Sequence, residues 1–158
     1  MRTTVLFVSL CLLSISALPA AESKRQRIEP EGLFDHPAYT HLVTVEGNWK
    51  TLYVSGQISV DENFNCVGRG DWRAQYLKVM ENLRIALKAG GATYSDVTYI
   101  RRFVTDMGAY FEMLRKERNP VPDYFQGQPP ASTLIGVTAL ADECFLMEID
   151  AIAAVPAE

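Results

Sequence analysis

One stretch of the chain has the period of an α-helix, whereas the segments on either side of it have the period of β-strands. The stretch begins at Asp71, a residue that favours the N-cap position, and ends at Gly90-Gly91. Apolar side chains recur within it at three- and four-residue spacing, at Leu77, Met80, Leu83 and Leu87. Because this apolar stripe is one-sided, it predicts a helix that packs on one face of a sheet.

Five segments have the composition of β-strands. The first two flank the turn formers Gly47-Asn48 and predict a β-hairpin. The third contains Arg101 and Arg102, which must point to opposite faces because strand side chains alternate. The last alternates apolar residues with a set that includes Glu148. The predicted strands are 41–46, 51–55, 97–104, 131–137 and 145–153.

A second, shorter helix is predicted at 110–118, because Asn119-Pro120 and Pro122 would end it. Segment 58–70 is too rich in turn formers for a long element and predicts a loop that could include a short edge strand. The order of strands, helix, strand, helix and strands predicts an α+β fold, in which a mixed β-sheet carries two helices on one face. A chain of 158 residues with this order is expected to form one folded domain.

The first residues have the organisation of a targeting segment. Arg2 is followed by an uncharged apolar run over 5–18 and by the small residues Pro19-Ala20-Ala21. The competing interpretation is a membrane span, but the run is shorter than the ~20 apolar residues that a spanning helix needs. We therefore expect a cleaved signal peptide and a periplasmic or secreted protein. The predicted division is a signal peptide at 1–20, a flexible linker at 21–35 and one domain at 36–156.

The formal net charge of the chain is −4 at pH 7. An acidic protein repels phosphate backbones, which argues against a nucleic-acid partner. The basic cluster Lys24-Arg25-Gln26-Arg27 falls in the predicted linker, where a solvated segment is the ordinary interpretation. No stable membrane insertion is expected once the signal has been removed.

Two of the three cysteines remain after removal of the signal, namely Cys66 and Cys144. In an oxidising compartment they could pair, provided that their Cα atoms lie within about 7 Å. Two buried free thiols are an equally good interpretation of the sequence. A mass difference of two hydrogens between native and reduced protein would separate the two.

The usual motifs of metal, cofactor and triad chemistry are missing from the sequence. The two histidines, His36 and His41, have neither HExxH spacing nor a nearby cysteine, so no metal site is predicted. Ser55 is not in a GxSxG elbow, which argues against a serine nucleophile. The glycine-rich Gly68-Arg69-Gly70 lacks the lysine of a phosphate-binding loop, and no cofactor is expected.

Three segments resemble motifs of the YjgF/RidA (Rid) family, the endoribonuclease L-PSP-like proteins. Tyr53-Val54-Ser55-Gly56-Gln57-Ile58 is similar to the family's SGQ motif. Glu81-Asn82-Leu83, with Gly90-Gly91-Ala92 after it, is similar to its helix-to-strand signature. Pro130-Ala131-Ser132-Thr133 and 148–153 are similar to its C-terminal PAR[ST] and EIEAIA pair. Each motif alone is weak, but the three follow one another in the family's order.

The resemblance implies a chorismate-mutase-like fold for a RidA-like domain at 36–156. It also implies a barrel-like homotrimer with small-molecule clefts between subunits. A sheet with both helices on one side leaves its other face uncovered, and a trimer would bury that face at its centre.

The resemblance also implies the residues of the cleft. Tyr39 matches the tyrosine of a Y-[SV]-[HQ] segment, Ser55 matches the serine of SGQ, and Gly56 would permit a close backbone approach. Glu148 matches the first glutamate of EIEAIA, which positions the attacking water in the family. Without the resemblance, an acid on the outer face of a strand would be interpreted as simply solvated.

The chain departs from the family at Ser132, which stands next to Thr133 where the family has an arginine. That arginine grips the substrate carboxylate with two parallel hydrogen bonds, and a serine cannot replace its fork. In this respect the chain resembles the members of the family that lack this arginine. Arg101 or Arg102 could reach the cleft as a substitute, but a surface ion pair is the ordinary role of such residues.

Two functions are compatible with these residues. The first is an enamine or imine deaminase, a C–N hydrolase of the 2-iminobutanoate/2-iminopropanoate type, with Glu148 as the catalytic base. Tyr39, Ser55, Gly56, Ser132 and Thr133 would then bind the ligand. The second is a non-catalytic trimeric protein that binds a small metabolite outside the cytoplasm.

Overall fold

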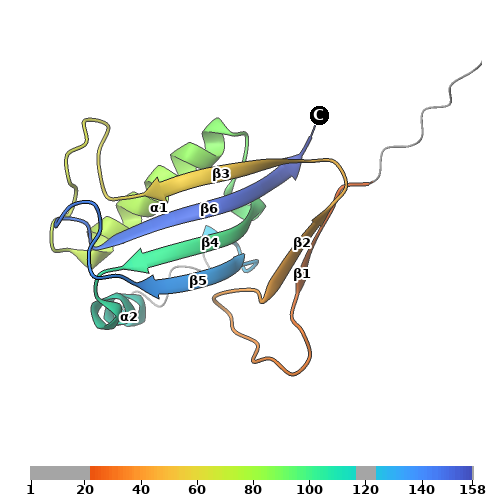
Figure 1. The fold of residues 1–158 in the computed structure, drawn as a ribbon, viewed down its shortest axis with the longest axis horizontal. Helices are drawn as coiled ribbons and strands as arrows, with labels where there is room; N and C mark the ends of the chain where they lie inside the picture. The colour runs from red at the N-terminus through yellow and green to blue at the C-terminus, as the bar shows by residue number, and fades with distance from the viewer. Residues whose placement is uncertain (1–21, 117–123, 158) are drawn as a thin grey trace, which may run out of the picture.

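The computed structural model describes residues 22–116 and 124–157, so the predicted signal peptide at 1–20 lies outside the described residues. Its centre is a four-stranded mixed sheet in the order β3-β6-β4-β5 (Figure 1). Strands β4 and β5 are parallel, and β6 is antiparallel to both of its neighbours. The strand bounds are Trp49–Gln57 for β3, Val97–Val104 for β4, Ala131–Gly136 for β5 and Met147–Pro156 for β6.

Helix α1 (Trp72–Ala89) confirms the predicted long helix and its start signal. The side chain of Asp71 accepts a hydrogen bond from the backbone N–H of Ala74 at 3.0 Å, which makes it the N-cap. The buried stripe differs from the prediction in one respect, because Leu77 is 38% exposed. The apolar side chains that face the sheet are Tyr76, Val79, Met80, Leu83 and Leu87.

Helix α2 (Met107–Lys116) begins three residues earlier than the sequence indicates. Asp106 comes just before the helix, and its side chain caps it by accepting a hydrogen bond from the backbone N–H of Ala109. Both helices lie on the same side of the sheet, α1 behind β3 and β6 and α2 beside β5 (Figure 1). The predicted α+β fold with two helices on one face is therefore confirmed.

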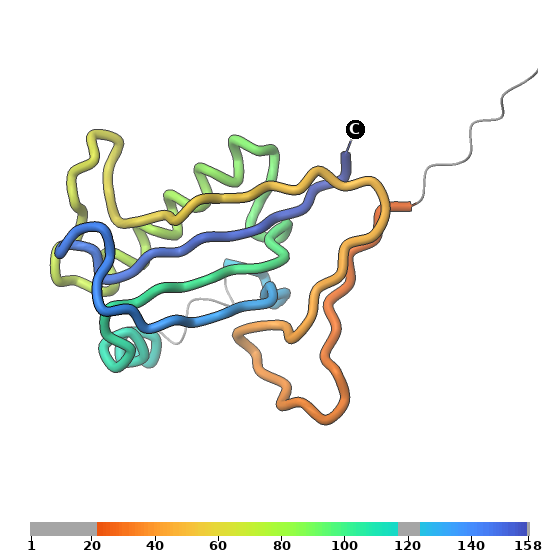
Figure 2. The backbone as a smooth tube through the Cα atoms, in the orientation of Figure 1, coloured from red at the N-terminus to blue at the C-terminus, as the bar shows by residue number. Residues whose placement is uncertain are grey.

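The N-terminal strands form an arm that leaves the main sheet (Figure 2). Strand β1 (Lys24–Ile28) pairs antiparallel with β2 (Leu42–Glu46), and β3 pairs with β6 instead of with β2. The predicted hairpin is therefore wrong, because alternation marks a strand without specifying its partner. Gly47, at a φ of +98°, turns the chain from the arm into β3.

The predicted flexible linker at 21–35 is wrong for β1. Two arginines of the basic cluster attach this strand to the body of the protein instead of pointing into solvent. Arg25 donates to the backbone oxygen of Ala154 at 3.1 Å, and Arg27 donates to that of Pro129 at 3.3 Å. The positive charges of the cluster thus help to hold a strand in place.

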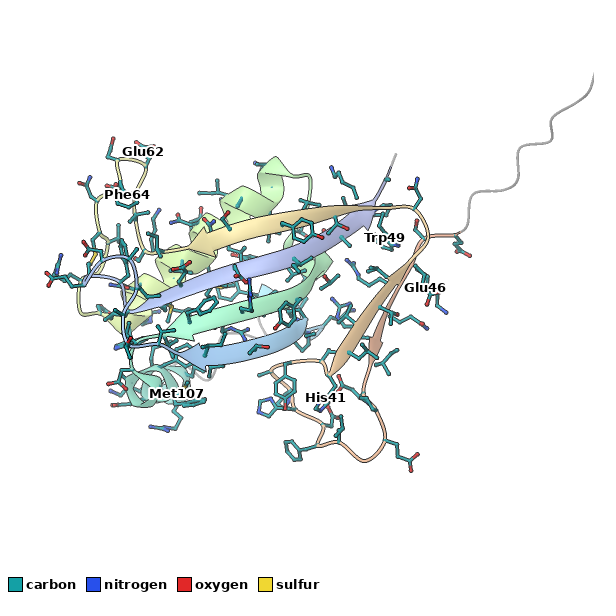
Figure 3. The ribbon with its side chains drawn as sticks, in the orientation of Figure 1. His41, Glu46, Trp49, Glu62, Phe64 and Met107 are labelled. Carbon is teal, nitrogen blue, oxygen red and sulfur yellow. A yellow bond between two sulfur atoms is a disulfide. The ribbon has the colours of Figure 1, made fainter. Side chains whose placement is uncertain are left out.

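A disulfide joins Cys66, in the loop after β3, to Cys144, in the loop before β6. Their Cα atoms are 6.5 Å apart, within the range that a disulfide spans. Of the two interpretations left open by the sequence, the structure contains the paired one. The loop at 58–70 has an isolated bridge between Val60 and Cys66 in place of a strand, and its tip with Glu62 and Phe64 lies far from the arm (Figure 3).

The side of the sheet that faces away from the helices is open to solvent in the single chain. Tyr53 stands on this open face with 81% of its surface exposed. Among the residues that the structure describes, no helix is long and apolar enough to cross a membrane.

Candidate functional site

A cavity of about 520 Å³ lies between helix α2, the edge of the sheet and the segment that joins the arm's strands. Strands β4 and β5 form its floor, α2 forms one wall, and 36–39 forms another. The lining side chains are His36, Ala38, Tyr39, Arg102, Tyr110, Phe111, Leu114, Arg115, Ser132 and Leu134. A space of this size, with mostly apolar walls and a few polar groups, is typical of a small-molecule site.

The arm contributes an aromatic wall to the cavity. The rings of His36 and Tyr39 are stacked, with centroids 4.8 Å apart, and Tyr39 meets His41 edge-on. His41 lies on the arm near the lower edge of the sheet (Figure 3), where its Nε2 donates to the backbone oxygen of Phe34 at 2.8 Å. Tyr39, predicted from the family resemblance, is thereby held at the cavity by its ring neighbours.

The floor of the cavity contains a buried arginine. Arg102 of β4 is 7% exposed, and its Nη1 donates to the hydroxyl oxygen of Ser132 on β5 at 2.5 Å. Its Nε and Nη2 have no hydrogen-bond partner among the described residues. A guanidinium has five N–H donors, and a buried cation without an anionic partner is costly.

The surroundings of Arg102 are aromatic as well as polar. Burial raises the pKa values of the Tyr76 and Tyr110 phenols above their ordinary value, and the positive charge of Arg102 partly opposes this in both. The electrostatic influence of Arg102 on both phenols indicates that it lies near them. No Asp or Glu is among the residues that line the cavity, whereas Arg102 and Arg115 both are. The cavity is therefore cationic and suited to an anion.

The neighbouring arginine has the opposite environment. Arg101 lies on the open face, half-exposed, and binds the Asp150 carboxylate through Nε at 3.0 Å and through Nη2 at 2.7 Å. This is the surface ion pair that the sequence led us to expect of both arginines. The structure thus separates two candidates that the sequence left equal.

A second group of predicted site residues lies on the other side of the sheet. Glu148 of β6 points to the open face, opposite Phe103 in the strand register. Gly56 of β3 lies directly against it, since a side-chain carbon at Gly56 would overlap Oε1 of Glu148. The prediction that Gly56 permits a close approach therefore has a structural basis, and the group that approaches is the glutamate.

Ser55 and Thr133 are also on the open face. Ser55 lines a shallow depression together with Tyr53 and the Arg101–Asp150 pair. Thr133 is exposed, and its hydroxyl lies 2.6 Å from that of Tyr99. Neither residue lines the cavity that contains Arg102.

The six predicted residues therefore divide into two groups within one chain. Tyr39 and Ser132 line the cavity, whereas Ser55, Gly56, Thr133 and Glu148 lie on or beside the open face. Sequence reasoning missed the wall that α2 provides, including Tyr110 and Phe111. The sequence did contain one signal for Arg102. Residues two apart on a strand lie on the same face, and Arg102 therefore shares its face with the apolar Ile100 and Val104.

No group of three or more potential metal-binding side chains occurs within 22–116 and 124–157. The polar groups that line the cavity are the guanidinium groups of Arg102 and Arg115, the His36 ring and hydroxyls, whereas the Glu148 carboxylate lies on the open face. They suit the binding or hydrolysis of a small anionic molecule.

The fold and this cavity define a class of protein, namely a small α+β protein with a cavity at the edge of its sheet. Comparison with known proteins identifies the family within that class. A family model described as endoribonuclease L-PSP matches residues 34–155. The chain therefore belongs to this family, to which the YjgF/Rid proteins belong.

Individual relatives agree with this assignment. Protein DfrA of Myxococcus xanthus is 36% identical over 115 residues, which cover 73% of this chain and 83% of that protein. A RutC family protein of Sulfurisphaera tokodaii is 34% identical over 108 residues, covering 68% and 81%. The crystal structure of the Rid protein YyfB from Yersinia pestis matches with a TM-score of 0.73 and 31% identity, over 83% of this chain and 98% of that chain.

Proposed function

We propose that this protein is an exported hydrolase of small imines or enamines, of the 2-iminobutanoate/2-iminopropanoate deaminase type. The observation that carries the proposal is the cationic cavity beside β5, which contains Tyr39 and Ser132 and has no acidic lining. A small anionic substrate with an apolar part fits such a space.

The proposed reaction requires one activated water. An enamine first tautomerises to the imine, and water then adds to the carbon of the C=N bond. The resulting carbinolamine expels ammonia and leaves a carbonyl compound, so that imine plus water gives ketone plus ammonia. Glu148 is the proposed base that orients the water and takes its proton, while Ser55 and Tyr39 orient the substrate.

We further propose that a homotrimer completes the site. The carboxylate of Glu148 and the cavity of Arg102 are on different sides of the sheet in one chain, so one protomer alone does not bring them together. A second copy whose open face meets the edge of the first copy's cavity would bring its Glu148 and Ser55 to that cavity. Covering Tyr53, which is 81% exposed, would add apolar burial to such an interface.

The disulfide supports the proposed export to the periplasm or the exterior. Disulfides form and persist in oxidising compartments, and they are rare in the cytoplasm. A native mass lower by two hydrogens than that of the reduced protein is expected for the mature chain, because Cys66 and Cys144 are bonded. An unchanged mass would remove this support for export.

The alternative is a trimer that binds a small metabolite without catalysis. The absence of the family's arginine at Ser132 favours a changed ligand or a lost reaction. An endoribonuclease activity, which the family's description names, is less well supported for this chain, because its net charge of −4 opposes RNA binding.

Ammonia release from 2-iminopropionate, generated in situ from an amino acid, tests the proposal. The wild type should accelerate it, and Glu148→Gln should lower the rate by about 100-fold or more, as expected for loss of a general base. Glu143→Gln is the matched control, since Glu143 is an exposed acid paired with Arg69. A sedimentation measurement on the same sample should give three copies. A trimer without any acceleration would replace the hydrolase by the binding protein.

A further inference from the structure

Arg102 has far more hydrogen-bonding capacity than its surroundings use. Its Nη1 donates to Ser132, but no described residue accepts from its Nε or Nη2. No carboxylate among the described residues forms an ion pair with it. Proteins seldom keep a buried cation unpaired, because the desolvation of the charge is not recovered. An unpaired guanidinium in a cavity wall therefore indicates an anion that is supplied from outside the chain.

The neighbouring arginine shows which kind of anion the Nε and Nη2 edge of a guanidinium can bind. Arg101 uses its Nε and Nη2 to hold the two carboxylate oxygens of Asp150, at 2.7 to 3.0 Å. Arg102 has these same two nitrogens unoccupied. Because the fork of a guanidinium matches a planar carboxylate with two parallel hydrogen bonds, a carboxylate is the ligand group that best fits Arg102.

Ser132 has a defined part in this arrangement. Its oxygen accepts from Nη1 of Arg102, and its own hydrogen remains available to donate to an anion. Residues Arg102 and Ser132 both line the cavity. The Nε and Nη2 atoms are buried. The guanidinium would therefore have to turn toward the cavity in order to bind a carboxylate there. Ser132 is thus a positioning residue for the arginine on the next strand.

The other side chains that line the cavity indicate the chemistry of the rest of the ligand. Ala38, Phe111, Leu114 and Leu134 present carbon to the cavity, and no acidic side chain faces it. A ligand with a carboxylate at Arg102 would therefore place an apolar side chain against α2. This combination is that of a small carboxylic acid with a branched aliphatic or aromatic side chain.

We propose that Arg102, held by Ser132, is the carboxylate-binding residue of this site, and that the ligand is a small carboxylic acid with an apolar side chain. The guanidinium reaches the cavity from β4, whereas the family arginine would stand at position 132 on β5. This inference rests on the proposed function, because it places the ligand in the same cavity.

Calorimetric titration of the full mature chain with 4-methyl-2-oxopentanoate tests the inference. The wild type should bind this acid about 100-fold or more tightly than its methyl ester, since the ester has the same shape without the charge. Arg102→Met should lose about 100-fold or more of its affinity for the acid and retain its affinity for the ester. Arg101→Met, which removes the neighbouring cation on the open face, should change the affinity by less than about threefold.

A reciprocal exchange gives a second, independent variant. Arg102→Ser combined with Ser132→Arg keeps the composition and returns the guanidinium to β5, on the same face of the sheet. Binding of the acid should recover to within about tenfold of the wild type, because charged bidentate recognition is kept. A reciprocal variant as weak as Arg102→Met would contradict the idea that both positions serve one binding site.

The outcomes separate this inference from the hydrolase proposal. Binding that depends on Arg102, without ammonia release from any imine, supports the inference and removes the hydrolase. Ammonia release that is equal in wild type and Arg102→Met supports the hydrolase and overturns the inference. If Arg102→Met fails to fold, the wild type decides alone, because equal affinity for the acid and its ester would overturn the role of Arg102.

Discussion

Two adjacent arginines on β4 have opposite environments, and the difference separates a surface residue from a candidate binding residue. Arg101 points to the open face, where Asp150 neutralises it in the single chain. Arg102 points to the helix-covered face, where Ser132 is its only described hydrogen-bond acceptor. The protein therefore pairs the charge that water could have solvated and leaves unpaired a charge that is mostly shielded from water. A buried, unpaired charge of this kind is a candidate for function.

Adding a second cation to each face of the sheet should have the largest effect on stability. Ser132→Arg would place two guanidinium groups in one buried space and should lower the free energy of unfolding by about 3 kcal/mol or more. Thr133→Arg adds the same side chain at the next residue, on the exposed face, and should cost less than about 1 kcal/mol. Urea unfolding of both variants measures the difference. Equal losses would mean that the two faces do not differ in polarity as described.

Removing each arginine should also have different effects on the two faces. Arg102→Met should raise the free energy of unfolding of the ligand-free protein by about 2 kcal/mol, because an uncompensated buried charge is replaced by carbon. Arg101→Met should lower it by no more than about 1 kcal/mol, the usual contribution of a surface ion pair. Both changes in the free energy of unfolding can be measured from the urea midpoints, provided that the variants have the same dependence on urea concentration as the wild type. A loss of stability in Arg102→Met would indicate that the buried charge has a partner after all.

Alkaline pH probes the same buried environment with a smaller effect. Burial raises the pKa of the Tyr76 phenol above its unfolded value of 10.0, so the folded chain keeps this proton when the unfolded chain loses it. The associated stability is complete below pH 10 and is lost as the pH rises further, by up to about 1.4 kcal/mol per pH unit. Tyr76→Phe should reduce this slope above pH 10 and leave the slope below pH 9 unchanged. An identical alkaline slope in the variant would contradict the burial of the phenol.

Local signals in the sequence predicted most of the fold. The bounds of β4 were predicted correctly, and the Asp71 cap and apolar stripe located α1. Strand β1 was missed because its sequence, KRQRI, is polar and has no apolar alternation. Its stability comes from pairing with β2 and from arginine contacts with distant carbonyl groups, which no local pattern contains.

The candidate site was predictable only in part. The family resemblance located Tyr39 and Ser132, which meet at the cavity although they are far apart in the chain. It did not indicate that a cation from the next strand would contact Ser132. That contact depends on the register of β4 against β5, which pairs Ile100 with Ser132 and sets Arg102 diagonally beside it. Register between distant strands is a tertiary property, which a single sequence does not contain.

The Cys66–Cys144 bond has a topological consequence for the cavity. It closes a covalent ring that includes α1, β4, α2 and β5, so Arg102, Tyr110 and Ser132 all belong to the ring. Tyr39 and Glu148 lie outside it, one before the ring and one after it. A protease that cuts one peptide bond within the ring would produce two fragments that remain linked by the disulfide. The floor of the cavity therefore lies in a part of the chain whose pieces stay joined after a single cut.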